Sequence, residues 1–310
     1  MFLTNLNFRL ELRKTQYLLL YICYIYKSKH WNKLKQQEPN RLFVIKKPIF
    51  VSSNFYLKRI KRKFKVKKAG FSGTLDPFAK GCLITAFGQY TKLFRFLKKV
   101  PKTYRATLWL GTSSLSGDIE NVTSIEESSK LNSEDIKNEL DKLKGDITYT
   151  PPIYSAKKID GRRAYELARE GREIKMKPST MHVYSTKFIS YRHPFITFES
   201  SVSEGSYIRS LAQVLVERLD RVGTLSSLDR LNEGEFFFDN EKELNPLEYL
   251  DLEENAYTGT KEWIEFGKKI DIIYLEKKTE GNYLLKFDDF FSIISIENDE
   301  VTYLLNKVML

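Results

Sequence analysis

The chain has 310 residues, of which 42% are hydrophobic, enough for one large domain or for a catalytic domain with a smaller one. Lys and Arg total 51 against 40 Asp and Glu, a formal charge of +11. This surplus favours a polyanionic partner, nucleic acid or a membrane surface, although a lysine-rich proteome would give the same total. Cys23 and Cys82 form no CxxC pair and the three histidines are scattered. This inventory excludes a recognisable metal site and a disulfide framework, and favours the reducing cytoplasm.

The N-terminal segment carries the most apolar run, residues 17–26, which is about half the length of a membrane span. No small-residue cleavage site follows this run, which argues against a signal peptide. We therefore expect residues 1–38 to be an extension of unknown role outside the main fold. Anchoring of a basic protein at a membrane surface through residues 17–26 is the alternative.

The first elements of the main fold follow this extension. Residues 41–45 predict a short buried strand. The serines at 52–53 can cap a helix in which Leu57, Ile60 and Phe64 form an apolar stripe.

The rest of that helix is basic. Eight Lys and Arg lie within residues 58–68, without one acidic residue between them. They would repel one another on a solvated surface, so a surface that faces phosphates is the better interpretation. Lys58, Arg59, Arg62 and Lys65 are the candidate phosphate contacts.

Later elements mix strands and helices without regular βαβ alternation. Strands are expected at residues 82–88, 103–111, 182–191, 195–203, 270–278, 282–296 and 301–310. Helices are expected at residues 92–100, 133–145 and 206–219, with a shorter one ending near Gly171, and the polar residues 112–131 are expected to form a loop. This order predicts an α+β fold around a mainly antiparallel mixed sheet flanked by helices.

The composition turns acidic after about residue 240, and several short strand-like runs follow. We therefore expect three parts: the extension 1–38, a catalytic domain 39–240 and a small β-rich C-terminal domain 241–310.

One turn holds an isolated carboxylate next to the basic helix. It reads "AGFSGTLDPFAKG", residues 69–81. Pro77 biases Asp76 towards extended conformations, and Gly70 and Gly73 permit a close backbone approach. The pattern predicts a rigid loop that presents the Asp76 carboxylate. Ordinary loop punctuation by Gly and Asp-Pro is the alternative for this segment alone.

Six blocks, in order, resemble the TruB family of tRNA pseudouridine synthases, over roughly residues 40–236. The blocks are "KPIFVSS" (47–53), "GTLDPFAKGCL" (73–83), "KTYRATLWLG" (102–111), "GDITYTPPIYSAKKIDGRRAYELAREG" (145–171), "EGSYIRSLA" (204–212) and "GTLSSLDRLNEGEF" (223–236). The resemblance implies the pseudouridine-synthase fold. It also implies that the C-terminal domain is a diverged relative of the PUA domain, an RNA-binding β fold.

The resemblance further implies three catalytic residues. Asp76 matches the family's catalytic aspartate, and Arg209 matches the arginine that pairs with it. Tyr104 matches the tyrosine that packs on the target uracil and is a candidate for proton transfer at C5. The ionised Asp76 is expected to act as base or nucleophile at the ribose, with Arg209 favouring its charged form.

Other positions are implied to bind or support the substrate. Leu228 matches a leucine that lines the uracil pocket, and Lys47, Lys92 and Tyr207 match supporting or RNA-contacting positions. Phe71 stands where the family usually has histidine, so it can stack in the RNA loop but cannot hydrogen-bond. Phe50 stands where the family usually has glycine.

The implied activity is isomerisation of uridine to pseudouridine at position 55, in the T loop of tRNA. The target base must leave its stack, and stacking on Tyr104 would offset part of that cost. The reaction involves no redox change, so we expect no cofactor and no metal, and nothing requires more than a monomer. A noncatalytic tRNA-folding chaperone on the same scaffold and the same chemistry on another RNA are the alternatives.

Overall fold

The computed structural model describes residues 39–159, 161–172 and 174–310, and Asn40–Leu310 form one compact unit. The expected extension 1–38, with its apolar run at 17–26, lies outside the described residues. Within the described ranges, no helix combines the length and the apolar character that a membrane crossing needs.

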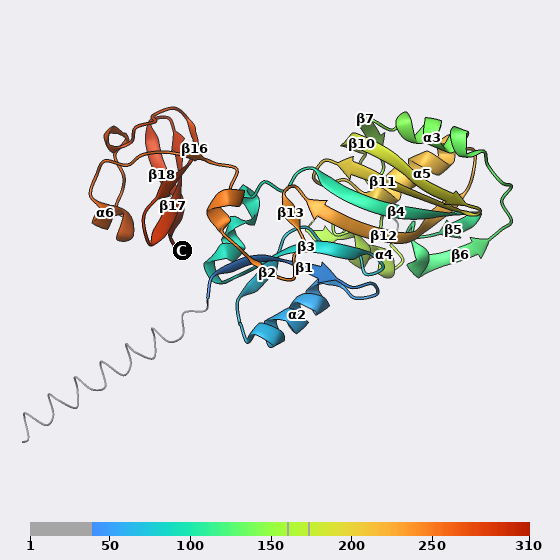
Figure 1. Cartoon of the computed structure of the whole chain (residues 1–310), viewed down its shortest axis with the longest axis horizontal. Helices are drawn as coiled ribbons and strands as arrows, with labels where there is room; N and C mark the ends of the chain where they lie inside the picture. The colour runs from blue at the N-terminus through green and yellow to red at the C-terminus, as the bar shows by residue number, and fades with distance from the viewer. Residues whose placement is uncertain (1–38, 160, 173) are drawn as a thin grey trace, which may run out of the picture. The chain divides into compact units, whose positions relative to one another are not determined.

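A large mixed sheet forms the middle of this unit (Figure 1). Its strands are β1 (Arg41–Lys47), β2 (Ala69–Phe71), β3 (Lys80–Phe87), β4 (Lys102–Leu110), β7 (Gly145–Tyr149), β10 (Ser179–Arg192), β11 (Phe195–Val202), β12 (Gly223–Glu233), β13 (Phe236–Phe237) and β14 (Glu243–Leu244). Their spatial order is β14-β1-β3-β12-β4-β11-β10-β7, with β2 beside β3 and β13 beside β12. Within the described part of this sheet, neighbouring strands run antiparallel except β3 and β12, which are parallel. Strand β12, which the sequence did not predict, therefore lies centrally between β3 and β4.

Several helices pack on this sheet through apolar side chains. The α-helices are α2 (Ser53–Phe64), α3 (Ser133–Asp141), α4 (Ala164–Arg169), α5 (Ile208–Arg218) and α6 (Lys261–Glu265), and the 3-10 helices are η1 (Gly88–Phe96), η2 (Ile119–Asn121), η3 (Pro246–Tyr249) and η4 (Ile272–Tyr274). Leu140 of α3 and Leu211 of α5 share one core with Phe198 of β11, whereas Ile60 of α2 packs in a separate core with Phe43. Burial of these side chains, rather than helix propensity, holds the short helices in place.

A second sheet forms near the C-terminus (Figure 1). Its strands are β15 (Glu253–Glu254), β16 (Gly281–Lys286), β17 (Phe290–Glu297) and β18 (Glu300–Met309). Phe291 and Val308 of this sheet are buried in one core with Leu42 and Ile84 of the large sheet. Strand β14 lies beyond residue 240 and still pairs with β1, so the large sheet includes residues that the predicted C-terminal domain would contain. The three-part division and the PUA-like character of the C-terminal residues stay predictions.

The predicted fold class is confirmed: the described elements form an α+β arrangement around a mainly antiparallel mixed sheet. The predicted loop at 112–131 is wrong in part, because β5 (Thr112–Ser114) and β6 (Val122–Ile125) form a hairpin there. Another small hairpin pairs β8 (Lys158–Ile159) with β9 (Arg162–Arg163).

Two further predicted elements are wrong. The predicted strand 270–278 contains the 3-10 helix η4 instead, because the Asp271 side chain accepts a hydrogen bond from the Ile273 N–H and closes a local turn. The predicted helix 92–100 is the 3-10 helix η1, which ends at Phe96 because the next residue, Leu97, is extended and bridges to Leu250. In the second case a tertiary pairing overrides local preference.

Candidate active site

The loop between β2 and β3 carries Asp76 and is fixed through its backbone. The Asp76 carbonyl accepts a hydrogen bond from the Ala79 N–H at 3.1 Å, which closes a turn with Pro77 at its second position. At the first turn of α2, the Ser53 hydroxyl donates to the Leu75 carbonyl at 2.9 Å and accepts from the Leu75 N–H at 3.0 Å. These contacts present the Asp76 side chain from a rigid turn, as the Gly-Pro pattern predicts, and attach that turn to the start of the basic helix.

Lys47 supports the same loop from inside the protein. Its side chain is fully buried and donates hydrogen bonds to the carbonyls of Pro48 at 2.9 Å, Val51 at 2.6 Å and Pro77 at 3.2 Å. Burial lowers the pKa of Lys47 to about 8, although the nearby charge of Asp76 opposes this change. Lys47 was expected either to support the site or to contact RNA. Because its ammonium group is buried, its position fits the supporting role.

Arg209, the second residue of α5, joins Asp76 to a second carboxylate. Its Nη2 lies 2.9 Å from Oδ2 of Asp76, and its Nη1 lies 3.3 Å from Oδ2 of Asp118. The same buried guanidinium donates to the carbonyls of Ser116 at 2.7 Å and Tyr154 at 2.9 Å. The contact between Asp76 and Arg209 that the sequence predicts is therefore present, between residues 133 positions apart in the chain.

Asp118 is a site residue that the sequence analysis missed. It is almost fully buried, and its Oδ1 accepts hydrogen bonds from the Ser116 hydroxyl at 2.6 Å and the Glu120 N–H at 3.0 Å. The polar run around it looked like a solvated loop. One signal was available: an arginine in the first turn of a helix lies at the positive end of the helix dipole and needs anions to balance it.

The charge of Asp76 depends mainly on its burial and on two charged neighbours. Burial raises the pKa of Asp76, the Arg209 guanidinium opposes this rise, and the like charge of Asp118 adds to it, so that the net direction is upward. The side chain keeps 32% of its surface exposed and lines a cavity. Arg209 favours the ionised form of Asp76, as expected, and offsets the cost of burying its charge only in part.

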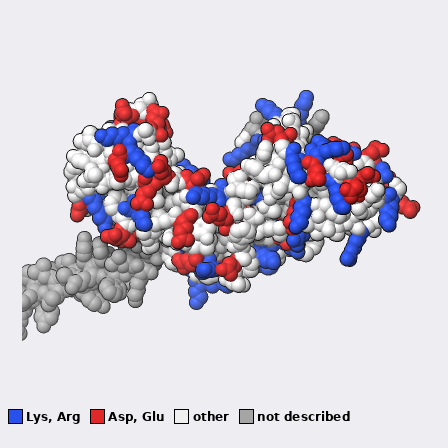
Figure 2. Space-filling model, turned by 45° about the horizontal axis from the view of Figure 1, so that its top comes forward, with Lys and Arg blue, Asp and Glu red and all other residues white. Residues whose placement is uncertain are grey.

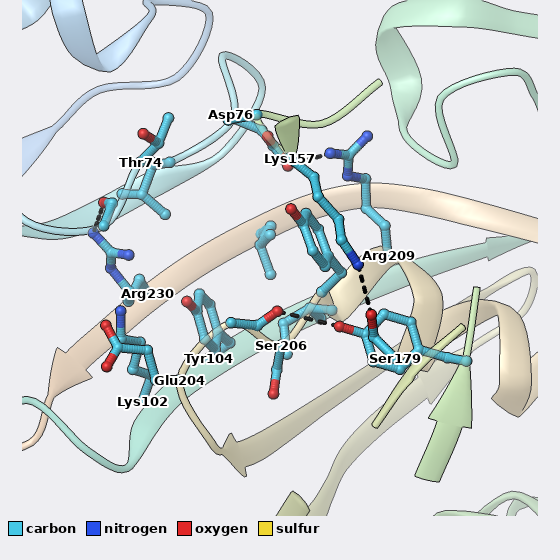
Figure 3. A pocket seen from close by; sticks show the side chains of 18 of the residues that line it. Thr74, Asp76, Lys102, Tyr104, Lys157, Ser179, Glu204, Ser206, Arg209 and Arg230 are labelled. Carbon is cyan, nitrogen blue, oxygen red and sulfur yellow. Dashed lines mark hydrogen bonds and ion pairs between the residues drawn. The ribbon is translucent and has the colours of Figure 1, made fainter. Parts of the chain in front are cut away.

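A cavity of about 580 Å³ opens beside this ion pair (Figure 3), a volume typical of small-molecule sites. Asp76, Arg209, Tyr104, Tyr207 and Leu228 all line it. The residues with predicted catalytic roles and the predicted uracil-binding Leu228 therefore line one cavity. Within the described residues, no group of three or more His, Cys, Asp or Glu side chains is placed to hold a metal ion.

A second buried charge cluster lies in the cavity wall, and the sequence analysis missed it too. Glu233 lies between two cations: its Oε2 is 3.0 Å from Lys102 Nζ, and its Oε1 is 2.8 Å from Arg230 Nη2. Arg230 also donates to the carbonyls of Gly73 at 2.9 Å and Cys82 at 2.8 Å. The three charged residues of the cluster come from β4 and β12, and the Gly73 carbonyl comes from the Asp76 loop. The unpredicted pairing of β12 with β4 brings these residues together.

Two predicted positions depart from the resembled pattern. Phe50, where that pattern has glycine, adopts a φ of +56°, in the left-handed region that favours glycine. Phe71 is half-buried on β2 and packs in the core that contains Phe43 and Phe87, outside the set of cavity-lining residues. Stacking of Phe71 on RNA therefore stays a prediction, and the structure gives its ring a packing role.

The predicted basic contacts lie outside the cavity. Lys58, Arg59 and Arg62 are exposed along α2, Lys65 is exposed at the C-cap of that helix, and Lys92 is exposed on η1. Over the face shown in Figure 2, Lys and Arg side chains lie among Asp and Glu side chains. Positive charge is therefore mixed with negative charge on that face, whereas α2 has no acidic residue of its own.

Solved structures share this fold. The chain aligns with a Cbf5-Nop10-Gar1 complex at a TM-score of 0.61 and 17% identity, covering 87% of this chain and 84% of that one. It aligns equally well with an H/ACA RNP bound to a substrate RNA containing 2'-deoxyuridine, at 15% identity and covering 85% of that chain. Identities this low bear on the fold alone.

Sequence comparisons are more specific. Residues 61–208 match the model of the TruB family pseudouridylate synthase, N-terminal domain. A tRNA pseudouridine synthase B of Sulfurovum sp. (strain NBC37-1) is 53% identical over 269 residues, which cover 87% of this chain and 97% of that protein. A tRNA pseudouridine synthase B of Campylobacter jejuni (strain RM1221) is 51% identical over the same length. These matches make the chain an enzyme of the pseudouridine synthase class. It belongs to the TruB family.

Proposed function

We propose that this protein converts uridine to pseudouridine at position 55, in the T loop of tRNA, with Asp76 as the catalytic carboxylate. The observation that carries the proposal is the 2.9 Å ion pair between Asp76 and Arg209 in a cavity that Tyr104 and Leu228 also line. The relatives named tRNA pseudouridine synthase B support tRNA as the substrate.

The residues of the cavity suit each step of this isomerisation. The N1–C1′ bond of the target uridine breaks, the uracil turns, a C5–C1′ bond forms, and the proton on C5 is transferred to N1. The Asp76 carboxylate acts on the ribose as base or nucleophile. In this proposal Tyr104 packs on the uracil and takes part in the proton transfer, and Leu228 gives the ring an apolar surface. Both residues line the cavity, which supports these roles.

The target uridine reaches this cavity by base flipping. Leaving its stack costs a few kcal/mol, and stacking against an aromatic side chain offsets part of that cost. Helix α2 supplies phosphate contacts through Lys58, Arg59, Arg62 and Lys65, and its first turn is bonded to the Asp76 loop through Ser53. Phosphate contacts then set the register of the RNA while the loop selects the nucleotide.

One copy of the chain contributes all of these groups, so the proposal needs no second protomer. It includes the cytoplasm as the compartment, on the cysteine usage of the sequence.

Mapping of pseudouridine in an unmodified tRNA transcript tests this function. Purified protein should form pseudouridine at position 55 and at no other uridine, and a transcript with cytidine at that position should give no product. Tight binding without any product would refute the proposed activity on this RNA. Product at a different position would refute the T-loop assignment while leaving the chemistry intact.

A further inference from the structure

The second charge cluster results from the register of β4 and β12. These strands pair Glu233 with Lys102 and Arg230 with Tyr104, directly across the ladder. Side chains of such pairs lie within contact distance. The cluster is therefore built into the strand pairing that also positions Tyr104, and it does not depend on a mobile surface residue.

The cluster holds more positive than negative charge. Lys102 and Arg230 are two cations, and both ion pairs use the one carboxylate of Glu233. The side chains are 7%, 1% and 0% exposed, respectively. Glu204, a cavity-lining carboxylate outside the cluster, is paired with Lys99 at 2.9 Å. A buried, uncompensated cation is unfavourable unless something negative faces it.

The excess charge faces the cavity. Lys102 and Arg230 both line it, on the side away from Asp76 and Arg209, with Tyr104 between the two groups (Figure 3). The loop backbone rests directly on the cluster, because a Cβ added at position 73 would lie 3.0 Å from Lys102 Nζ. The cavity thus has a carboxylate at one end and a net positive wall at the other.

The proposed reaction creates an anion between these two ends. When the N1–C1′ bond breaks, its electron pair leaves with the uracil, and the negative charge spreads over N1 and the two carbonyl oxygens until C5 attacks C1′. Preorganised charges in a water-poor site stabilise such an intermediate more strongly than water does. We propose that Lys102 and Arg230, oriented by Glu233, stabilise the detached uracil anion while it turns. This inference rests on the proposed function.

Neutralising Lys102 tests the inference with two substrates. Lys102→Met leaves Arg230 and Glu233 as a one-to-one pair, and Lys102→Gln additionally keeps an N–H donor for Glu233. The probe is a T stem-loop RNA with either uridine or 5-fluorouridine at the target position. Fluorine withdraws electrons and stabilises the uracil anion by itself. Cleavage of the N1–C1′ bond of 5-fluorouridine therefore needs less help from the protein. The matched control is Lys137→Met, which removes an exposed cation of α3 that is paired with Glu134 and does not line the cavity.

Single-turnover rates give the result. We expect both Lys102 variants to consume the target uridine of the RNA on the order of 10²-fold more slowly than the wild type does. Their affinity for the RNA should change less than about threefold. The deficit should shrink to about tenfold or less with 5-fluorouridine, and Lys137→Met should match the wild type with both RNAs. Equal deficits on both substrates, or Lys102 variants as fast as the wild type, would overturn the inference. A wild-type protein that forms no pseudouridine would instead refute the proposed function itself.

Discussion

Replacing Arg209 by lysine tests the electrostatic link between the two carboxylates. The guanidinium of Arg209 reaches four acceptors from two nitrogens: Asp76, Asp118, and the carbonyls of Ser116 and Tyr154. A lysine keeps the positive charge but has one nitrogen on a chain of different geometry, so it cannot reach both carboxylates at once. At least two charge-assisted hydrogen bonds are lost, and each is worth roughly 1.5–3 kcal/mol.

About 3 kcal/mol of that loss, if it acts at the transition state, slows the reaction on the order of 10²-fold. We therefore expect Arg209→Lys to reduce the single-turnover rate of pseudouridine formation by at least that factor, while the affinity for a T stem-loop RNA changes little. Thermal unfolding of the variant separates loss of the fold from loss of catalysis. A folded variant that keeps more than about a third of the wild-type rate would refute the argument that one planar guanidinium must hold both carboxylates.

Three further predictions concern titration, RNA binding and the loop. Burial and Asp118 raise the pKa of Asp76, and its ionised form is the one we propose to react. The rate should therefore fall as the pH drops through a value above the usual carboxyl range. Asp118→Asn should move this acid limb of the pH–rate profile to lower pH, and an unmoved limb would contradict the coupling. Replacing Lys58 and Arg62 by glutamine should weaken binding to every RNA alike and reduce the salt slope by about one unit per residue; an unchanged slope would place α2 outside the RNA interface. Gly73→Ala should cost about 1–2 kcal/mol of unfolding free energy, since its φ is +64°, and wild-type stability in urea would show that the loop relaxes freely.

Local sequence chemistry predicted the loop that presents the candidate carboxylate. The Gly-Pro pattern around Asp76 restricts the backbone by itself, and the structure has the expected turn with Pro77 at its second position. The serine cap of α2 and its buried Ile60 are likewise visible in sequence, because capping and helical periodicity act over a few residues. The contact of Asp76 with Arg209 required the family resemblance, since no local rule joins residues so far apart.

Features that depend on strand pairing were out of reach. Strand β12 has no clear alternation, since its register with β4 shifts after Leu225 and again after Arg230, so the sequence analysis assigned it no strand. Without β12 in the sheet, nothing places Glu233 opposite Lys102. Gly81 shows how closely β3 and β12 approach each other: a Cβ at this position would lie 2.3 Å from the Arg230 carbonyl oxygen. Such proximity is a property of the assembled sheet and of no single segment.

The role of Asp76 is tested most directly by one comparison of rates. Asp76→Asn and the wild type are each mixed, in excess, with unmodified tRNA, so that only a single turnover is observed. Pseudouridine at position 55 and the RNA affinity are then quantified. Asp146→Asn, which changes an exposed carboxylate beside His182, is the matched control. We predict that the Asp76 variant binds tRNA as the wild type does and forms product at less than about one thousandth of the wild-type rate. Product formation by that variant at a rate near that of the control would contradict the account.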